Sequence, residues 1–445
     1  MERTRILILG AAGRDFHTFN ILYRDDPGVE VVAFTAQQIP HIDDRRYPPE
    51  LAGSLYPEGI PIEPETRLEE LVADHGVGRC VLAYSDLSYQ TVMALGARVN
   101  VAGAAFEIPA PQATMLESSR PVVAVCASRT GAGKSPTSRA VAATLEEAGL
   151  RVGIVRHPMP YGDLVKQRVQ RFADALDLEK HPVTFVEREG YEPQIARGAV
   201  VWAGVDYEAI LREAEAEADI ILWDGGNNDT SFFRPDLQIV VVDPHRVGHE
   251  LSYYPGEHNV RLADVVIVNK VDTADAEAVE QVEANVRAVN PDARVARTGC
   301  PPTADHPSIL EGRRVLAVED GPTTTHGGMR YGAATLAAEA LGATLVDPRP
   351  FAAGELADTF EAYPDVGPLL PAMGYGRQQI DDLQETIRRA PGAGVEAVAV
   401  GTPIDLSRLL DIPLPYTRVR YDVQLTGGLT WDDILGPVLG GMSTG

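Results

Sequence analysis

The stretch Ser128-Arg-Thr-Gly131-Ala-Gly133-Lys134-Ser135 decides the fold of this chain. It follows the pattern G-x-x-x-x-G-K-[ST], with Ser128 in place of the opening glycine, and serine is also small. An apolar strand is predicted directly before it, over 122–127, and a helix directly after it, over 136–148. Pro136 suits the first turn of that helix, where a missing backbone N–H costs nothing. Strand, glycine-rich loop and helix in this order predict a P-loop.

In a P-loop the glycines let successive backbone N–H groups wrap phosphate groups. Lys134 is expected to reach the β- and γ-phosphates of a nucleoside triphosphate, and the Ser135 hydroxyl to bind Mg²⁺. The full set of residues expected around the phosphates is Arg129, Thr130, Gly131, Ala132, Gly133, Lys134, Ser135 and Pro136.

Two further motifs follow predicted strands. The run Ile220-Ile-Leu-Trp-Asp224 is an apolar strand ending in an aspartate, the Walker B pattern, so Asp224 is expected to hold Mg²⁺ directly or through water. The run Asn269-Lys-Val-Asp272 has the form N-K-x-D. It indicates base recognition by Asn269 and Asp272, because Asp272 can accept the N1–H and the amine of guanine. Its alternative interpretation is a strand end followed by a helix-capping aspartate.

A basic segment follows the predicted strand at 151–156. It contains Arg156, His157, Asp163 and Lys166, and it lies at the carboxyl edge of the predicted sheet, where ligands of this architecture bind. Arg156, His157 and Lys166 can offset the charge of an anionic substrate. Asp163 can orient Mg²⁺ or a phosphate acceptor.

Apolar strands alternate with amphipathic helices along the chain, which predicts an α/β fold with a doubly wound, mostly parallel sheet. We expect an N-terminal Rossmann-like α/β domain at 1–118, a P-loop domain at 119–345 and a C-terminal α/β extension at 346–445. The break at Ile108-Pro-Ala-Pro-Gln112 marks the first linker. The glycine-rich segment 436–445 is expected to fray.

The 445-residue chain carries a net charge of −25. Such a charge argues against nucleic acid or an anionic membrane as partner, since the field would repel both. No apolar run approaches the length of a membrane span, and the start of the chain does not resemble a signal peptide, so a cytoplasmic protein is expected. The three cysteines are far apart in sequence and predict neither a disulfide framework nor a zinc site.

Taken together, these segments resemble the cyclic 2,3-diphosphoglycerate synthetases. The resemblance covers Gly10-Ala-Ala-Gly-Arg-Asp-Phe16, the P-loop, the segment 156–163, Asp224-Gly-Gly-Asn-Asn-Asp229 and Thr325-His-Gly-Gly328. It implies an ATP- and Mg²⁺-dependent enzyme that closes 2,3-diphosphoglycerate into a cyclic phosphoanhydride and releases ADP and phosphate. It also implies membership of the P-loop class that includes dimeric ATPases and dethiobiotin synthetase, hence a homodimer.

Within that resemblance each candidate residue has an expected role. Lys134, Asp163 and Asp224 are the catalytic candidates, with Ser135 and Asp224 as Mg²⁺ ligands. The small phosphorylated acid is expected to meet Arg14, Arg156, His157 and Lys166. Two alternatives stay open at this point. One is a regulatory or metallochaperone-type GTPase that uses the N-K-x-D motif, and the other is an ATP-dependent carboxylate-activating ligase.

Overall fold

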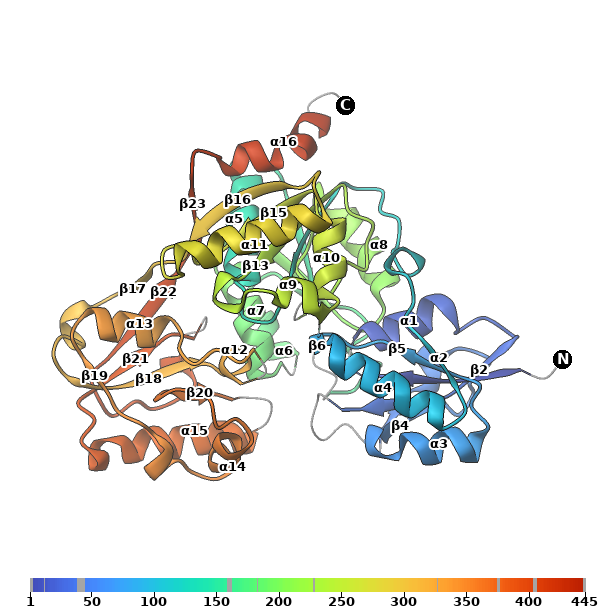
Figure 1. Ribbon diagram of the computed structural model, residues 1–445, viewed down its shortest axis with the longest axis horizontal. Coiled ribbons are helices and arrows are strands. Elements are labelled where there is room, and N and C mark those ends of the chain that lie inside the picture. Colours follow the sequence, from blue (N-terminus) through green and yellow to red (C-terminus); the bar gives the residue numbers. More distant parts are fainter. Residues whose placement is uncertain are drawn as a thin grey trace.

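The computed structural model describes residues 3–11, 13–37, 45–157, 162–181, 183–226, 229–325, 327–373, 377–402 and 406–442. These residues form three α/β units, each built on its own sheet (Figure 1). The P-loop unit lies in the middle, and the N-terminal and C-terminal units flank it on opposite sides. The predicted fold class is confirmed.

The N-terminal domain contains a six-stranded sheet in the order β3-β4-β2-β1-β5-β7, and only β3 runs antiparallel to its neighbour. Alternate residues of the first strand face opposite layers. Ile6 and Ile8 pack with helix α1, whereas Leu7 and Leu9 pack with α3 and α4. The elements are β1 (Thr4–Leu9), α1 (Arg14–Leu22), β2 (Val29–Ala36), β3 (Arg46–Tyr47), α2 (Pro49–Ala52), β4 (Ile60–Pro64), α3 (Leu68–His75), β5 (Arg79–Leu82), β6 (Leu87–Ser88), α4 (Tyr89–Val101) and β7 (Ala105–Glu107).

The P-loop domain is built on a nine-stranded sheet in the order β10-β11-β9-β12-β8-β13-β15-β16-β23. Its two edge strands, β10 and β23, are antiparallel and the others are parallel. The elements of this domain are β8 (Val122–Ala127), α5 (Lys134–Glu147), β9 (Val152–Arg156), β10 (Gln170–Phe172), α6 (Asp177–Lys180), α7 (Phe185–Ile195), β11 (Val200–Ala203), α8 (Tyr207–Glu217), β12 (Ile220–Trp223), β13 (Leu237–Val242), α9 (His249–Ser252), β14 (Tyr253–Tyr254), α10 (Gly256–Leu262), β15 (Val265–Val268), α11 (Ala276–Val289), β16 (Arg294–Gly299), β23 (Gln424–Thr426) and α16 (Trp431–Met442).

Helices cover both faces of this central sheet. In β8, Val123 and Val125 pack in the layer of α5, α7 and α16, whereas Val122 and Ala124 pack in the layer of α8, α10 and α11. Every residue of β8 is buried for this reason. The strand that carries the P-loop is therefore rigidly held on both sides.

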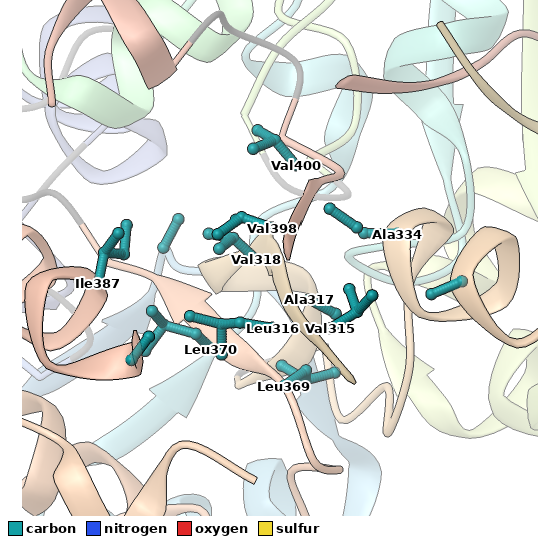
Figure 2. Close-up of a cluster of buried hydrophobic side chains, with 14 of the residues drawn as sticks. Val315, Leu316, Ala317, Val318, Ala334, Leu369, Leu370, Ile387, Val398 and Val400 are labelled. Atoms are coloured by element: carbon teal, nitrogen blue, oxygen red, sulfur yellow. The ribbon is translucent and has the colours of Figure 1, made fainter. Parts of the chain in front are cut away.

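The C-terminal domain begins earlier than expected. Its sheet has the order β17-β22-β21-β18-β19, with β20 also paired to β18, so its strands lie on both sides of the expected boundary at 345. Figure 2 shows its single core, in which Val315 to Val318 of β18 are packed with Leu369, Leu370 and Ile387. The elements are β17 (Pro302–Ala304), β18 (Arg314–Asp320), α12 (Gly321–Thr324), α13 (Ala333–Ala340), β19 (Thr344–Leu345), α14 (Glu355–Ala362), β20 (Leu370–Ala372), α15 (Arg377–Arg389), β21 (Ala397–Val400) and β22 (Tyr416–Tyr421).

The end of the chain returns to the P-loop domain. β23 extends the central sheet beside β16, and α16 lies across the same domain (Figure 1). Up to residue 442 this segment is helical, so the expectation that it frays was wrong there. The physical reason is that Ile434, Leu435 and Val438 are buried against the layer of α5, which outweighs the cost of the glycines. Residues 443–445 lie outside the described residues.

Among the described residues, no helix has both the length and the apolar character that a membrane crossing requires.

Candidate nucleotide and substrate site

The P-loop lies between β8 and α5, and its glycines adopt backbone conformations that other residues avoid. Gly131 has φ +79° and Gly133 has φ +111°, both in the left-handed region. A Cβ atom on Gly133 would also lie 2.0 Å from Nδ2 of Asn269. The loop is therefore tightly wrapped, with Lys134 as the first residue of the following helix.

Three side chains at or after the ends of neighbouring strands meet beside this loop. Strands β9, β12 and β8 are adjacent in the sheet, and they bring Arg156, Asp224 and Lys134 together at its carboxyl edge. Lys134 pairs with Oδ1 of Asp224, and Arg156 pairs with Oδ2. Burial alone would raise the pKa of Asp224, but Arg156 and Lys134 outweigh it and hold that pKa below its usual value. Burial lowers the pKa of Lys134.

The donors expected for Mg²⁺ are compatible with that ion. A hydroxyl from Ser135 and a carboxylate from Asp224 are hard oxygen ligands, the kind that Mg²⁺ prefers. Within the ranges that the structure describes, no cluster of three or more His, Cys, Asp or Glu side chains forms a complete metal site.

The N-K-x-D motif supports the P-loop from behind. Asn269 is fully buried, its Nδ2 donates to the Ala132 carbonyl at 2.9 Å, and its Oδ1 accepts from the Thr298 hydroxyl at 2.8 Å. Both ends of the amide are engaged by protein atoms, so the structure does not support the interpretation that Asn269 contacts a base edge. Its contact with Ala132 nevertheless keeps it in the nucleotide site as a positioning residue.

Lys270 has the same supporting role, which the sequence interpretation missed. Its Nζ donates to the Gly131 carbonyl at 2.7 Å and pairs with Asp243 at 2.8 Å. Burial raises the pKa of Asp243, but Lys270 and Arg246 outweigh it and lower that pKa to about 2. Lys270 is the lysine of the N-K-x-D pattern, but only Asn269 and Asp272 were assigned roles from the sequence.

Asp272, by contrast, is exposed. One of its carboxylate oxygens accepts from the Cys300 backbone N–H at 3.0 Å. Cys300 lines the cavity in front of the P-loop, so Asp272 lies near one end of that cavity. Its proposed contact with a base stays a prediction.

A cavity of about 250 Å³ opens between the P-loop and the C-terminal domain. One wall is the P-loop with Arg156 and Lys270, and the opposite wall is the carboxyl end of β18 with the loops around α12 and α13. The residues of this second wall include Glu319, Asp320, Pro322, Thr323, Thr324, Met329, Tyr331, Gly332 and Ala333. The loop at 319–328, whose end belongs to the resemblance noted in the sequence, thus faces the P-loop directly, although His326 lies outside the described residues.

Glu319 is the buried acid of this wall. Its Oε1 accepts from the backbone N–H of Thr335 at 2.7 Å and from the Thr335 hydroxyl at 2.8 Å. Burial raises the pKa of Glu319 to about 7. These hydrogen bonds cap the start of α13, so its position has a structural explanation.

Arg246 joins the two walls of the cavity. Its Nη1 donates to the Thr130 carbonyl of the P-loop at 2.9 Å and to the Gly327 carbonyl of the C-terminal domain at 2.5 Å. Its Nη2 pairs with Asp243 at 2.9 Å. Arg246 therefore couples the position of the C-terminal domain to the shape of the P-loop.

The other expected substrate cations lie on the side of the N-terminal domain. Arg14 pairs with Asp229 at 3.4 Å and donates to the Thr230 carbonyl at 2.7 Å. His157 lies nearby, with Nε2 3.6 Å from an oxygen of Asp229. Burial, assisted by Arg14 and Lys134, lowers the pKa of His157 to about 3, so this ring is neutral at physiological pH.

Arg129 is also held on this side. It pairs with Asp86 of the N-terminal domain at 2.6 Å, and its guanidinium lies 3.7 Å from the centre of the Tyr253 ring. Arg129 still lines the cavity beside the P-loop.

Two predicted residues lie apart from the cavity. Lys166 is highly exposed and pairs with Asp163 at 3.7 Å. Asp163 accepts from the backbone N–H groups of Val165 and Lys166, as a turn-capping aspartate does. Neither residue is part of the described lining of the cavity.

Comparison with known proteins adds sequence relatives. A sequence profile described as cyclic 2,3-diphosphoglycerate synthetase, P-loop domain, matches residues 195–299. Arginine synthetase ArcE of Thermococcus kodakarensis is 56% identical over 427 residues, covering 96% of this chain and 95% of that protein. Cyclic 2,3-diphosphoglycerate synthetase of Thermococcus sibiricus is 24% identical over 106 residues, which is 24% of each chain.

Among solved structures, LpxK from Aquifex aeolicus in complex with ATP has a similar fold. The match covers 74% of this chain and 90% of the LpxK chain. The TM-score is 0.40 and the sequence identity 14%.

Proposed function

Because the chain belongs to the cyclic 2,3-diphosphoglycerate synthetase family, we propose that it is an ATP- and Mg²⁺-dependent synthetase that makes arginine. The observation that carries this proposal is the 56% identity, over 96% of the chain, to a relative named arginine synthetase. Arginine differs from its ureido analogue citrulline by one group, an imino nitrogen in place of the carbonyl oxygen. A nucleoside triphosphate supplies the means of removing that oxygen.

The proposed reaction has two steps. The ureido oxygen attacks the γ-phosphorus of ATP, the bond from that phosphorus to the bridging oxygen breaks, and ADP leaves. Ammonia then attacks the ureido carbon, the carbon–oxygen bond breaks, inorganic phosphate leaves and the added nitrogen loses its extra protons. The first step is a phosphoryl transfer, which needs alignment and charge neutralisation more than covalent help from the protein.

The residues beside the P-loop fit that first step. Backbone N–H groups of the loop and Lys134 would hold the β- and γ-phosphates, and Arg156 would approach the transferred group. Ser135 and Asp224 would hold Mg²⁺, which neutralises charge on the same phosphates. Lys134 and Arg156 are paired with Asp224, and they can shift towards phosphate oxygens when a nucleotide binds.

The balance of charge supports an acceptor group without a large negative charge. Three cations, Lys134, Arg156 and Arg14, face two buried carboxylates, Asp224 and Asp229. His157 is neutral at physiological pH, because burial lowers its pKa to about 3. These five groups together carry about one net positive charge, which the triphosphate would use. A ureido group is uncharged, whereas 2,3-diphosphoglycerate carries two phosphates and a carboxylate.

Closure of 2,3-diphosphoglycerate is the second candidate, and the profile match at 195–299 favours it. In that reaction one substrate phosphate attacks the γ-phosphoryl group of ATP, and the neighbouring phosphate then closes the ring and expels inorganic phosphate. Arg14, Arg156 and the other basic groups would need to leave their buried partners to meet this polyanion.

A phosphate-release assay separates the candidates. The purified chain is supplied with ATP and Mg²⁺ and with L-citrulline plus ammonium, with either of these alone, or with 2,3-diphosphoglycerate. We expect phosphate release and arginine, identified by mass spectrometry, only when citrulline and ammonium are both present. Release with 2,3-diphosphoglycerate instead would favour the second candidate.

Release from GTP without any acceptor would favour a GTPase, and activity with a carboxylic acid would favour a carboxylate ligase. The Lys134→Ala variant is the control for phosphate that does not come from the P-loop site.

A further inference from the structure

A second cavity, of about 360 Å³, lies between the P-loop domain and the C-terminal domain. We propose that it binds a small molecule carrying two or more phosphate groups, at a site separate from the P-loop. Its volume lies within the range of ordinary ligand pockets. Five arginines line it, Arg139, Arg197, Arg408, Arg418 and Arg420, against two acids, Glu192 and Asp422.

This concentration of positive charge contrasts with the whole molecule, whose net charge is −25. A protein this acidic repels anions in general, so it binds one only where cations are locally in excess. The lining has three more arginines than acids (five minus two). Arginine is well suited to phosphate, because its planar fork donates two parallel hydrogen bonds to phosphate oxygens.

Four of these arginines are ion-paired, so a phosphate group must displace carboxylates to bind here. Arg139 pairs with Asp422 at 3.5 Å, and Arg197 pairs with Glu146 at 3.3 Å. Arg408 pairs with Glu192 at 3.0 Å, and the Arg408 side chain is 68% exposed. Arg420 pairs at 2.7 Å with Asp305, which is not part of the described lining, and its side chain is 60% exposed. Exposed pairs of this kind are weak, so a phosphate group can displace the carboxylates at small cost.

The arginines come from both domains. Arg139 is on α5 and Arg197 follows α7, whereas Arg408, Arg418 and Arg420 belong to the C-terminal domain. At the boundary, Arg139 donates to the Tyr421 carbonyl at 3.1 Å. A ligand must carry at least two anionic groups to engage both walls, which is why we assign a polyphosphate rather than a single phosphate.

The site is distinct from the nucleotide cavity. Lys134, Ser135 and Arg156 line the first cavity and not the second, as far as the described lining extends, and Tyr421 is shared by both. Because α5 starts in the P-loop and carries Arg139 in its second turn, a ligand here would lie directly behind the nucleotide site.

Calorimetric titration of the metal-free full-length chain with inorganic pyrophosphate tests this assignment. We expect one binding event that Lys134→Ala retains and that Arg408→Gln/Arg420→Gln weakens on the order of tenfold or more, because two charged phosphate donors are lost. The matched control is Arg168→Gln/Arg388→Gln, which removes the same charge from two exposed, ion-paired arginines elsewhere. This control should bind as the parent does.

The proposal is overturned if no event survives Lys134→Ala, or if the two double variants bind pyrophosphate equally well. It is also overturned if citrate binds to this site as tightly as pyrophosphate, since the ligand would then be a polycarboxylate. Thermal unfolding gives a second readout, because a ligand that binds only the folded chain raises Tm. Pyrophosphate should raise the Tm of Lys134→Ala, and the same Arg408→Gln/Arg420→Gln changes made in that background should reduce the increase.

Discussion

The P-loop domain contacts its two neighbours in different ways. Its contact with the N-terminal domain is filled with side chains. His17 stacks on Phe232 with 4.2 Å between ring centres, and Arg14 and Arg129 form buried ion pairs with Asp229 and Asp86 across the boundary. Strands β6 and β14 also pair there, between Ser88 and Tyr253.

The contact with the C-terminal domain is hollow by comparison. Both cavities lie there, and two arginines cross the boundary to reach backbone carbonyls, Arg246 to Gly327 and Arg139 to Tyr421. The filled contact fixes the orientation of one domain, and the hollow contact leaves room for ligands. The cavity that we propose to be catalytic is therefore completed by the C-terminal domain, although the sequence suggested more substrate residues on the other side.

The largest expected effect is at the P-loop itself. Lys134→Ala should lower the rate of phosphate release by about 10³-fold, since it removes a charge that stabilises the transferred phosphoryl group. Steady-state kinetics measures the loss, and circular dichroism should match the parent. Near-normal activity with a normal spectrum would contradict the P-loop assignment, and with it the hollow contact as catalytic cavity.

The largest loss of unfolding free energy is expected from a substitution in the filled contact with the N-terminal domain. Arg14→Met leaves Asp229 buried without its ion-pair partner and should cost about 3 kcal/mol of unfolding free energy. Urea unfolding measures this loss.

Arg246→Met is the comparison variant on the hollow side. Arg246→Met should lower the free energy of unfolding less than Arg14→Met does, because Lys270 still pairs with Asp243 at 2.8 Å. An equal or larger loss for Arg246→Met would contradict the comparison.

Acid should weaken the filled contact through His17. Burial, outweighing a hydrogen bond to Thr114, lowers the pKa of His17 from 6.5 to about 3. Between these two values the unfolded chain binds the proton and the folded chain does not, so stability falls as pH falls below 6.5. Between pH 7 and pH 5 the free energy of unfolding of His17→Phe should therefore fall by about 2 kcal/mol less than that of the parent. Identical losses in urea unfolding would show that His17 is protonated in the folded chain.

Asn269 tests whether the N-K-x-D motif supports the loop or contacts the base. Asn269→Ala removes the hydrogen bond to Ala132 and should lower kcat/KM about tenfold, which corresponds to ~1.4 kcal/mol. The loss should be equal for ATP and GTP, with ATP preferred in both the parent and the variant. A change in the ATP to GTP ratio in parallel assays would restore the interpretation of Asn269 as a base-reading residue.

The smallest expected effect is at Lys166. Lys166→Ala removes an exposed ion pair and should change unfolding free energy by less than about 0.5 kcal/mol. The KM for the acceptor should also change less than about twofold, since an exposed charge outside the cavity is screened by salt. A large increase in KM, with the KM for ATP unchanged, would place the acceptor on the side of the N-terminal domain.

Local patterns predicted the elements of the candidate site well. The strand at 122–127 has the predicted bounds, and the helix predicted at 136–148 lies at Lys134–Glu147. The P-loop strand, Asp224 and Arg156 meet as strand order in a doubly wound sheet requires. Parallel strands present their carboxyl ends at one edge, so motifs placed after strands are brought together by topology alone. The sequence by itself therefore determined the P-loop, its lysine and aspartate, and the α/β class.

Only the tertiary structure decided what surrounds them. Asn269 became a support for the P-loop because its amide is buried against Ala132 and Thr298. Lys166 lies outside the described lining, with its side chain 84% exposed. The return of the chain end to the central sheet and the wall of the cavity at Glu319 and Tyr331 depend on contacts between residues far apart in sequence. Thr426 contacts Arg297 from 129 positions away, and Tyr331 contacts His245 from 86 positions away. Sequence periodicity reports which face of an element is apolar, but it does not report which other element that face will meet.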